Sequence, residues 1–155
     1  MASHSRYFWG FRLHGLFALD GTPRALALVS PKTPERDVCL QLLGRVQRHG
    51  QLIVVGDKGY AGREFAHQAA DLEALIARPA RKDEPHTGLH LAPIRQRIES
   101  IFWTCRDLLT LEQHGARTLH GLRARLSSRL LTLAAAIALN HRLGRPPRAL
   151  ADYTA

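Results

Sequence analysis

The feature that most constrains the fold is a pair of apolar runs separated by a turn signal. From Tyr7 to Leu19 the odd positions are mostly aromatic or aliphatic, whereas the even positions include Arg12 and His14. This period of two is typical of a strand with one apolar face. Asp20-Gly21 favours a tight turn, and the run Pro23–Val29 is largely apolar on both faces. We predict a β-hairpin of strands Tyr7–Leu19 and Pro23–Val29, with the second strand inside a sheet.

The rest of the chain alternates between helical and strand patterns. In order, we expect a helix over 35–48, strands over 52–55 and 74–77 flanking a helix over 63–71, and two later helices over 92–109 and 118–143. A hairpin followed by β-α-β units implies an α/β fold, a mixed sheet with helices on both faces plus C-terminal helices. We expect one domain over 1–145, an exposed loop over 79–91 and a frayed tail over 146–155.

Charge and cysteine usage narrow the class of protein. Lys and Arg total 22 against 13 Asp and Glu, which gives a net charge of +9. This excess favours a polyanionic partner such as nucleic acid, although a basic protein without such a partner has the same signature. Cys39 and Cys105 form no metal or disulfide pattern, so we interpret them as reduced core thiols of a cytoplasmic protein. The longest apolar run, Leu130–Leu139, is too short to span a bilayer, and no membrane partner is expected.

Two acidic residues stand where chemistry is plausible. Asp57 follows the buried run Leu52–Val55 between two glycines, at the strand end where ligands collect in open α/β sheets. On the helix expected over 92–109, a narrow stripe carries Glu99 with Arg95, Phe102 and Arg106. Taken alone, Asp57 is also typical of an ordinary turn that follows a strand. The stripe that carries Glu99, taken alone, is typical of a solvated helix face with an Arg–Glu pair. Together, two converging carboxylates in a basic chain could hold Mg²⁺ ions that act on a phosphodiester.

Three segments resemble motifs of DDE transposases of bacterial insertion sequences. Residues 7–14 (YFWGFRLH) are similar to the strand-two motif, and residues 54–60 (VVGDKGY) resemble the second catalytic segment. The third is Arg95-x3-Glu99-x6-Arg106, which resembles the family's Arg-Glu-Lys signature with arginine in place of lysine, while Ala92 stands where a tyrosine is usual. The nearest branch is the insertion sequence family numbered 982, followed by the family numbered 5.

The resemblance implies an RNase H-like fold, Mg²⁺ or Mn²⁺ as cofactor, and DNA cleavage and strand transfer between transposon ends and target. It makes Asp57 and Glu99 the metal ligands and catalytic residues. Contacts to DNA would come from basic residues, namely Arg95, Arg106, Lys58 and Arg12. A homo-oligomer and a separate upstream transposase fragment both remain open as protein partners, and the expected location is the bacterial cytoplasm, at the nucleoid.

In the family, a first catalytic aspartate lies on a strand before the motif at Tyr7. Only six residues precede Tyr7 here, and none is Asp or Glu. We therefore expect a partial catalytic domain without its first strand, and a truncated transposase that is inactive alone. Two alternatives remain: a non-catalytic, basic DNA-binding or regulatory module derived from a transposase, and an interaction protein that uses its last amphipathic helix.

Overall fold

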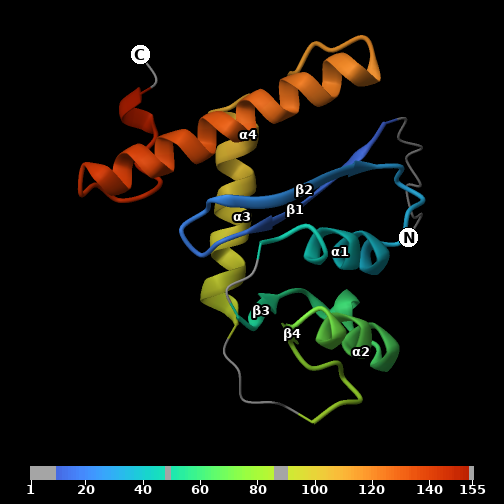
Figure 1. Ribbon diagram of the computed structural model, residues 1–155. Coiled ribbons are helices and arrows are strands. Elements are labelled where there is room, and N and C mark those ends of the chain that lie inside the picture. The colour runs from blue at the N-terminus through green and yellow to red at the C-terminus, as the bar shows by residue number, and fades with distance from the viewer. Residues whose placement is uncertain (1–9, 48–49, 86–90, 154–155) are drawn as a thin grey trace, which may run out of the picture.

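The computed structural model describes residues 10–47, 50–85 and 91–153 (Figure 1). Its elements follow the order expected from the sequence. They are β1 (Arg12–Phe17), β2 (Pro23–Val29), α1 (Glu35–Leu43), β3 (Leu52–Val55), the 3₁₀ turn η1 (Lys58–Tyr60), α2 (Arg63–Asp71), β4 (Ala74–Ala77), α3 (Ala92–Asp107), α4 (Leu119–Arg142) and the 3₁₀ turn η2 (Ala151–Tyr153).

The strands pair as a hairpin and as a β-α-β unit. β1 and β2 are antiparallel, with Arg12 opposite Val29, and β3 and β4 are parallel and joined through α2. Within the described residues the two pairs are separate two-stranded sheets. The α/β prediction is confirmed, and the mixture of antiparallel and parallel pairing is compatible with an RNase H-like fold.

The predicted turn at Asp20-Gly21 is confirmed, but β1 is shorter than predicted. The Asp20 carboxylate accepts from the Thr22 backbone N–H at 2.8 Å, and Gly21 has a φ of 97°, a left-handed conformation that favours glycine. The strand ends at Phe17 rather than Leu19 because the Ala18 N–H already closes the turn by donating to the Thr22 carbonyl. Gly10 and Phe11 also lie outside the strand, and residues 7–9 lie outside the described ranges.

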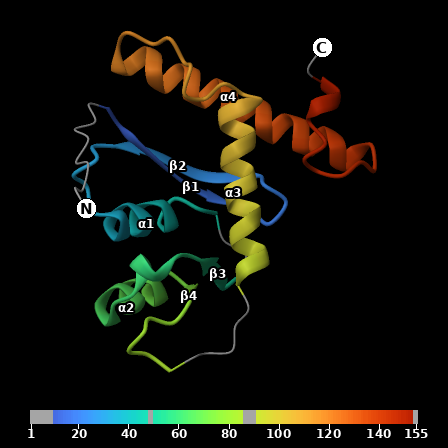
Figure 2. The same cartoon turned by 180° about the vertical axis from the view of Figure 1, so that it is seen from behind.

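The prediction that β2 is an inner strand is wrong for the described part of the chain. β2 pairs with β1 alone. Its apolar residues are explained by helices instead, because α1 and α4 lie on opposite sides of the hairpin and both contact β2 (Figures 1 and 2). A strand can therefore be apolar on both faces at the edge of a sheet when a helix covers each face.

Helix ends depart from the predictions at identifiable residues. α1 stops at Leu43 instead of 48, since Gly44, a weak helix former, begins a turn in which the Arg45 N–H donates to Leu42. α3 ends at Asp107 instead of 109, and Thr110 shortly afterwards has a φ of 49°. Thr118 is the N-cap of α4, accepting from the Gly121 N–H at 3.1 Å, a contact typical of threonine at this position.

The predicted frayed tail is wrong for residues 146–153. Leu150 is buried in the core, and the side chain of the buried Asn140 on α4 donates to the Pro147 carbonyl at 3.0 Å. The Tyr153 hydroxyl donates to the Asn140 side-chain oxygen at 2.7 Å. The segment therefore packs back along α4 because one buried amide needs the partners that it supplies.

Two apolar clusters hold the elements in place. One joins α3 and α4 to one face of the hairpin around Ile101, Leu133 and Ile137, and includes the free thiol of Cys105. The other joins α1 and α2 to β4 around Leu43, with the free thiol of Cys39. Both thiols are buried in the core as predicted, and burial raises the pKa of each to about 11, which favours the protonated form over the reactive thiolate. No helix in the described residues is long and apolar enough to cross a membrane.

Candidate active site

Three of the predicted site residues, Asp57, Arg95 and Glu99, line one cavity of about 330 Å³ between the two strand pairs. Asp57 comes from the carboxyl end of β3, whereas Arg95 and Glu99 come from α3. His14 of β1, Tyr60 of η1 and Cys39 of α1 also line the cavity, and most of the remaining wall consists of apolar side chains of α1, α3 and the strands. The structure thus brings together the two carboxylates that are separated by 42 positions in the sequence.

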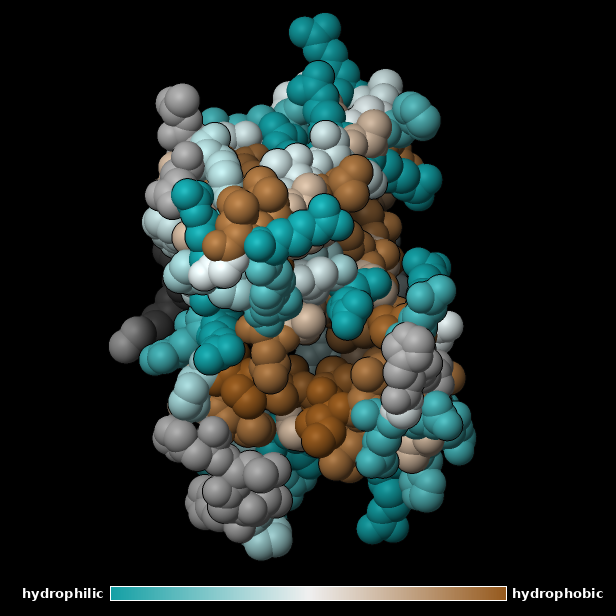
Figure 3. Space-filling model, turned by 60° about the vertical axis from the view of Figure 1, so that its left-hand side comes forward, coloured by the Kyte–Doolittle hydropathy of each residue, from teal (hydrophilic) through white to brown (hydrophobic). Residues whose placement is uncertain are grey.

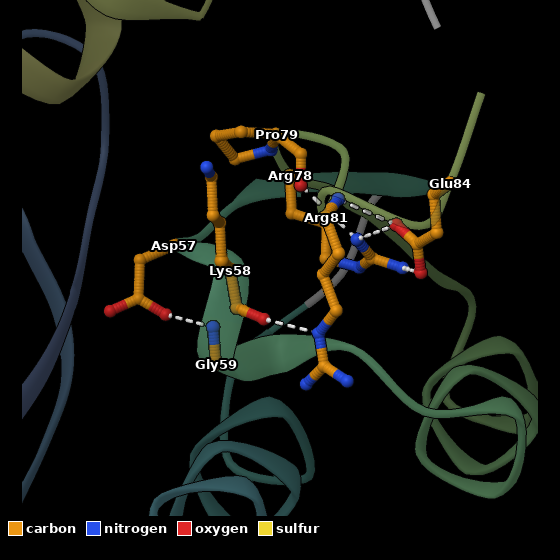
Figure 4. A network of polar contacts seen from close by, with 7 residues as sticks. All are labelled: Asp57, Lys58, Gly59, Arg78, Pro79, Arg81 and Glu84. Carbon is orange, nitrogen blue, oxygen red and sulfur yellow. Dashed lines mark hydrogen bonds and ion pairs between the residues drawn. The ribbon is translucent and has the colours of Figure 1, made fainter. Parts of the chain in front are cut away.

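Asp57 has a local structural role as well as its place on the cavity wall. Its Oδ1 accepts from the Gly59 backbone N–H at 2.6 Å and caps η1. Asp57 can therefore stabilise the turn and bind a ligand at the same time, because its carboxylate is exposed and has a second oxygen for a ligand. Figure 4 shows this carboxylate directed away from the Lys58 side chain.

A network of polar contacts from the segment after β4 supports the loop that carries Asp57 (Figure 4). The sequence did not predict this network. Arg78, just past β4, forms a two-pronged ion pair with Glu84. Arg81 donates its backbone N–H to Glu84 and its Nε to the Lys58 carbonyl at 3.4 Å. The segment expected to be an exposed loop is thus tied to the site, although Arg81 itself is exposed and the side chain of Glu84 is about one-third exposed.

A second brace comes from α1. The Arg36 Nε donates to the Gly59 carbonyl at 3.0 Å. Neither the Arg36 nor the Arg81 contact to this loop had a signal in the sequence beyond an excess of arginine, because both side chains donate to backbone carbonyls, which any residue supplies. The positions of these carbonyls follow only from the fold.

On α3, three of the four residues of the predicted stripe line the cavity. Arg95, Glu99 and Phe102 all line the cavity, and their spacing of four and three residues explains why they share a face. Arg106 is not among the cavity-lining residues; it forms an ion pair with Asp107 at 2.9 Å near the end of the helix. It lies two turns from Glu99, about 10 Å along a helix.

Three further residues of the strands and the η1 turn lie at or near the cavity. Arg12 forms an ion pair with Glu35 at 2.7 Å, and Lys58 directly follows Asp57. Burial lowers the pKa of the His14 imidazole, with Glu35 opposing the effect and Arg12 adding to it. His14 Nε2 is inaccessible to solvent and has no hydrogen-bond partner within the described residues.

The two carboxylates have suitable chemistry for a hard divalent cation. Mg²⁺ prefers oxygen ligands and is often held by one or two carboxylates together with waters and phosphate oxygens. Asp57 and Glu99 could supply that number. Across residues 10–47, 50–85 and 91–153 no group of three or more His, Cys, Asp or Glu side chains is placed to hold a metal. The remaining 18 positions (1–9, 48–49, 86–90 and 154–155) contain no Asp or Glu, so they supply no further carboxylate side chain.

The arginine-rich start of α4 is partly occupied by structural contacts. Arg125 donates to the His114 carbonyl, and Arg129 donates to the Thr110 hydroxyl at 3.2 Å. Both side chains hold the segment between α3 and α4 against α4. Arg125 and Arg129 are therefore engaged in contacts within the chain, which weakens the case for a DNA-binding surface at the start of α4.

One of the comparisons with known proteins identifies the family of this chain. The family model described as the transposase DDE domain matches residues 1–135, which is most of the chain and includes Asp57, Arg95 and Glu99. No curated protein and no solved structure matches the chain. Because the match covers far more than half of the sequence, the chain belongs to the transposase DDE domain family.

Proposed function

We propose that this chain acts in DNA transposition, with Asp57 and Glu99 as the ligands of a divalent metal ion at which DNA strands are cleaved and transferred. The observation that carries the proposal is their meeting at one cavity, with Arg95 beside them. Membership of the transposase DDE domain family supports the reaction class, and a divalent metal is general in that family. The motifs at 54–60 and 95–106 favour the insertion sequence families numbered 982 and 5.

Each residue has a physical task in this proposal. Bound Mg²⁺ or Mn²⁺ would activate a water or a 3′-hydroxyl and stabilise the leaving oxygen. Asp57 offers Oδ2 while Oδ1 stays on the Gly59 N–H, so the carboxylate is held in one orientation. Glu99 approaches the cavity from a different element, α3. The packing of this helix, rather than the conformation of a loop, therefore positions Glu99 relative to Asp57.

Basic residues around the cavity would hold the phosphate backbone. Arg95 lines the cavity itself, whereas Lys58 and Arg12 do not line it but directly adjoin in sequence two residues that do, Asp57 and Leu13. Arg106 extends the same line along α3. Guanidinium groups bind phosphates with two parallel hydrogen bonds, which positions DNA without reading its sequence.

We further expect no strand transfer by this chain alone. Two carboxylates meet at the cavity, and the described residues contain no group of three or more His, Cys, Asp or Glu side chains that could hold a metal ion. An upstream transposase fragment or a second copy of the chain would then supply what is lacking.

The experiment is a salt titration of duplex DNA binding in the presence of Mn²⁺. Arg95→Ala and Lys58→Ala should each lower the slope of log affinity against log salt by about 1, because each removes one phosphate contact. Arg142→Ala, at the far end of α4, is the charge-matched control and should leave the slope unchanged. Equal effects of all three variants would point to a general basic surface and against a DNA path at this cavity.

A further inference from the structure

The outer edge of β2 is an open strand edge. In the described part of the chain β2 pairs with β1 alone, so the edge that faces away from β1 has no ladder partner. Residues 25–29 contain no proline and no charged residue, and the shift in register between the two strands falls beyond them, between Leu16 and Phe17 of β1. Such features normally keep a free edge from pairing, because unpaired backbone N–H and C=O groups recruit another strand. This edge is therefore suited to accept one.

A groove of about 370 Å³ runs along this edge, between α1 and α4. Its lining includes the consecutive residues 26–29 of β2. Successive side chains of a strand point to opposite faces of a sheet, so neighbouring residues border one groove together where the groove follows the strand edge. Leu13 of β1 and two leucines of α4, Leu126 and Leu130, add apolar side chains to the lining. The groove thus offers a strand edge with an apolar floor.

The groove is separate from the candidate active site. Among the described residues it shares Leu13 alone with the cavity that Asp57 and Glu99 line. Figure 3 shows hydrophobic side chains gathered around a hollow in the lower half of the molecule, at the height of β3. The groove instead follows β2, which lies higher, between α1 and α4 (Figure 1). A ligand in the groove would therefore leave the carboxylates of the candidate active site accessible.

The two walls of the groove each carry an arginine and a neutral polar side chain. Gln41 of α1 and Arg45 just after the helix form one wall, and Arg123 and Ser127 of α4 form the other. All of these residues are exposed. Neither guanidinium has an ion pair or hydrogen bond within the described residues, and no described acidic residue lines the groove. Two unpaired positive charges therefore border the open edge, one on each side.

Charge and hydrogen bonding together select the occupant. A second copy of the chain would offer its own β2, whose charged residue is Arg24, and would bring the arginines of both copies together. The segments outside the described ranges contain no Asp or Glu and supply no negative charge. Nucleic acid supplies the charge, but phosphates only accept hydrogen bonds and would leave the carbonyls of the edge unpaired. An extended acidic peptide matches both the charge and the alternating donors and acceptors of the edge.

We propose that the outer edge of β2 binds an extended acidic segment of a partner protein, which adds a strand to the hairpin. Backbone hydrogen bonds to residues 25–29 give the affinity, and carboxylates that reach Arg45 and Arg123 give the selectivity. α1 and α4 lie on opposite sides of the hairpin, and successive side chains of a strand point to opposite faces. The two carboxylates are therefore separated by an odd number of positions. This inference does not require the metal chemistry proposed at Asp57.

The test titrates the full chain into fluorescently labelled peptides and follows their anisotropy. The probe, Thr-Val-Glu-Val-Thr-Glu-Val-Thr with blocked ends, places one glutamate on each face of the added strand. The same-face control, Thr-Val-Glu-Val-Glu-Thr-Val-Thr, has the same composition but places both glutamates on one face. The glutamine control replaces both glutamates by glutamine. The proline control replaces each valine by proline, which cannot donate to a strand ladder.

The controls should lose affinity in proportion to what each of them lacks. The same-face control should bind about two- to fivefold more weakly than the probe, because it loses one exposed ion pair. The glutamine control should bind more weakly still, since it loses both. The proline control should bind at least about tenfold more weakly, because it loses the ladder. Amide hydrogen exchange in residues 25–29 should slow when the probe binds, while exchange in α2 stays constant.

Variants of the chain test the two walls separately. Arg45→Gln and Arg123→Gln should each weaken binding of the probe about two- to fivefold, whereas Arg63→Gln, at an exposed position of α2, should not. With both walls changed, the probe and the glutamine control should bind equally. Absence of probe binding, or equal affinity of the probe and the proline or same-face control, overturns the proposal. It is also overturned if the two wall variants leave peptide binding unchanged and weaken duplex DNA binding instead, which would assign the groove to nucleic acid.

Discussion

Both terminal nitrogens of Arg78 donate to the Glu84 carboxylate, at 2.6 and 2.8 Å, just after the chain leaves β4. The same carboxylate accepts the Arg81 backbone N–H, and the Arg81 side chain reaches the carbonyl of Lys58, next to Asp57. The ion pair therefore fixes a surface segment that supports the Asp57 loop. Its arrangement predicts a specific response to acid.

The Glu84 titration should be shifted far to acid. Hydrogen bonds from Arg78, with a smaller contribution from the Arg81 N–H, lower the pKa of Glu84 from 4.5 to about 2. Because the folded pKa is depressed, the pair stabilises the loop fully above about 4.5, and this contribution is lost as the pH falls toward 2. The Arg81 amide proton shift in NMR should titrate with a midpoint near 2, and Glu84→Gln should abolish that titration. A midpoint near 4.5 would contradict the ion pair.

Two leucines of α4 should respond in opposite ways to truncation. Leu133 is 1% exposed in the core, whereas Leu131 is 70% exposed. Leu133→Ala should lower the free energy of unfolding by about 2–5 kcal/mol through lost burial and a residual cavity. Leu131→Ala should change it by less than about 0.5 kcal/mol, as for most surface positions. Urea denaturation of both variants measures the difference, and similar losses would mean that α4 packs in another rotation.

Asn140 should be the anchor of the C-terminal segment. Its side chain is fully buried and binds both the Pro147 carbonyl and the Tyr153 hydroxyl. Asn140→Ala leaves these groups unpaired and should cost about 2–3 kcal/mol in free energy of unfolding. Tyr153→Phe removes one hydrogen bond and should cost about 1 kcal/mol. If the segment is frayed in solution, both variants will unfold at the wild-type urea concentration.

Gly56 should be replaceable only when Tyr60 is changed as well. A Cβ at position 56 would lie 2.8 Å from Tyr60 Cδ2, and the Tyr60 ring packs against Phe65 at 5.9 Å between centroids. Gly56→Ala should therefore cost about 1–3 kcal/mol in free energy of unfolding through overpacking. In a Tyr60→Ala background the same change should cost much less, which a double-mutant cycle measures. Additive costs would rule out the predicted collision.

The sequence predicted best the elements whose limits are set locally. β3, α2 and β4 begin and end at the predicted residues, because each is a short apolar or amphipathic run bounded by residues that interrupt it. β1 and α1 ended early where a turn hydrogen bond or Gly44 competed with the periodic pattern. The packed tail was missed because its anchor, Asn140, lies 7 to 13 residues from its partners.

Some features of the candidate site could likewise be predicted from local sequence patterns, whereas others depend on contacts that only the fold creates. The meeting of Asp57, Arg95 and Glu99 followed from a strand end and a helix face, both of which periodicity reveals. The helix stripe alone did not show that Arg106 would instead pair with its neighbour Asp107. The braces from Arg36 and Arg81 depend on backbone carbonyls brought close by the fold, for which no side-chain pattern exists.

The central claim is that Asp57 and Glu99 bind one divalent metal site together, and Mn²⁺ binding followed by electron paramagnetic resonance tests it most directly. Asp57→Asn and Glu99→Gln should each weaken Mn²⁺ binding by at least about tenfold, since each removes one charged ligand. Asp83→Asn, an exposed carboxylate on the loop after β4, is the matched control and should bind as the wild type does. Unchanged Mn²⁺ affinity in both site variants would contradict the account and leave a basic DNA-binding module as the better description of this chain.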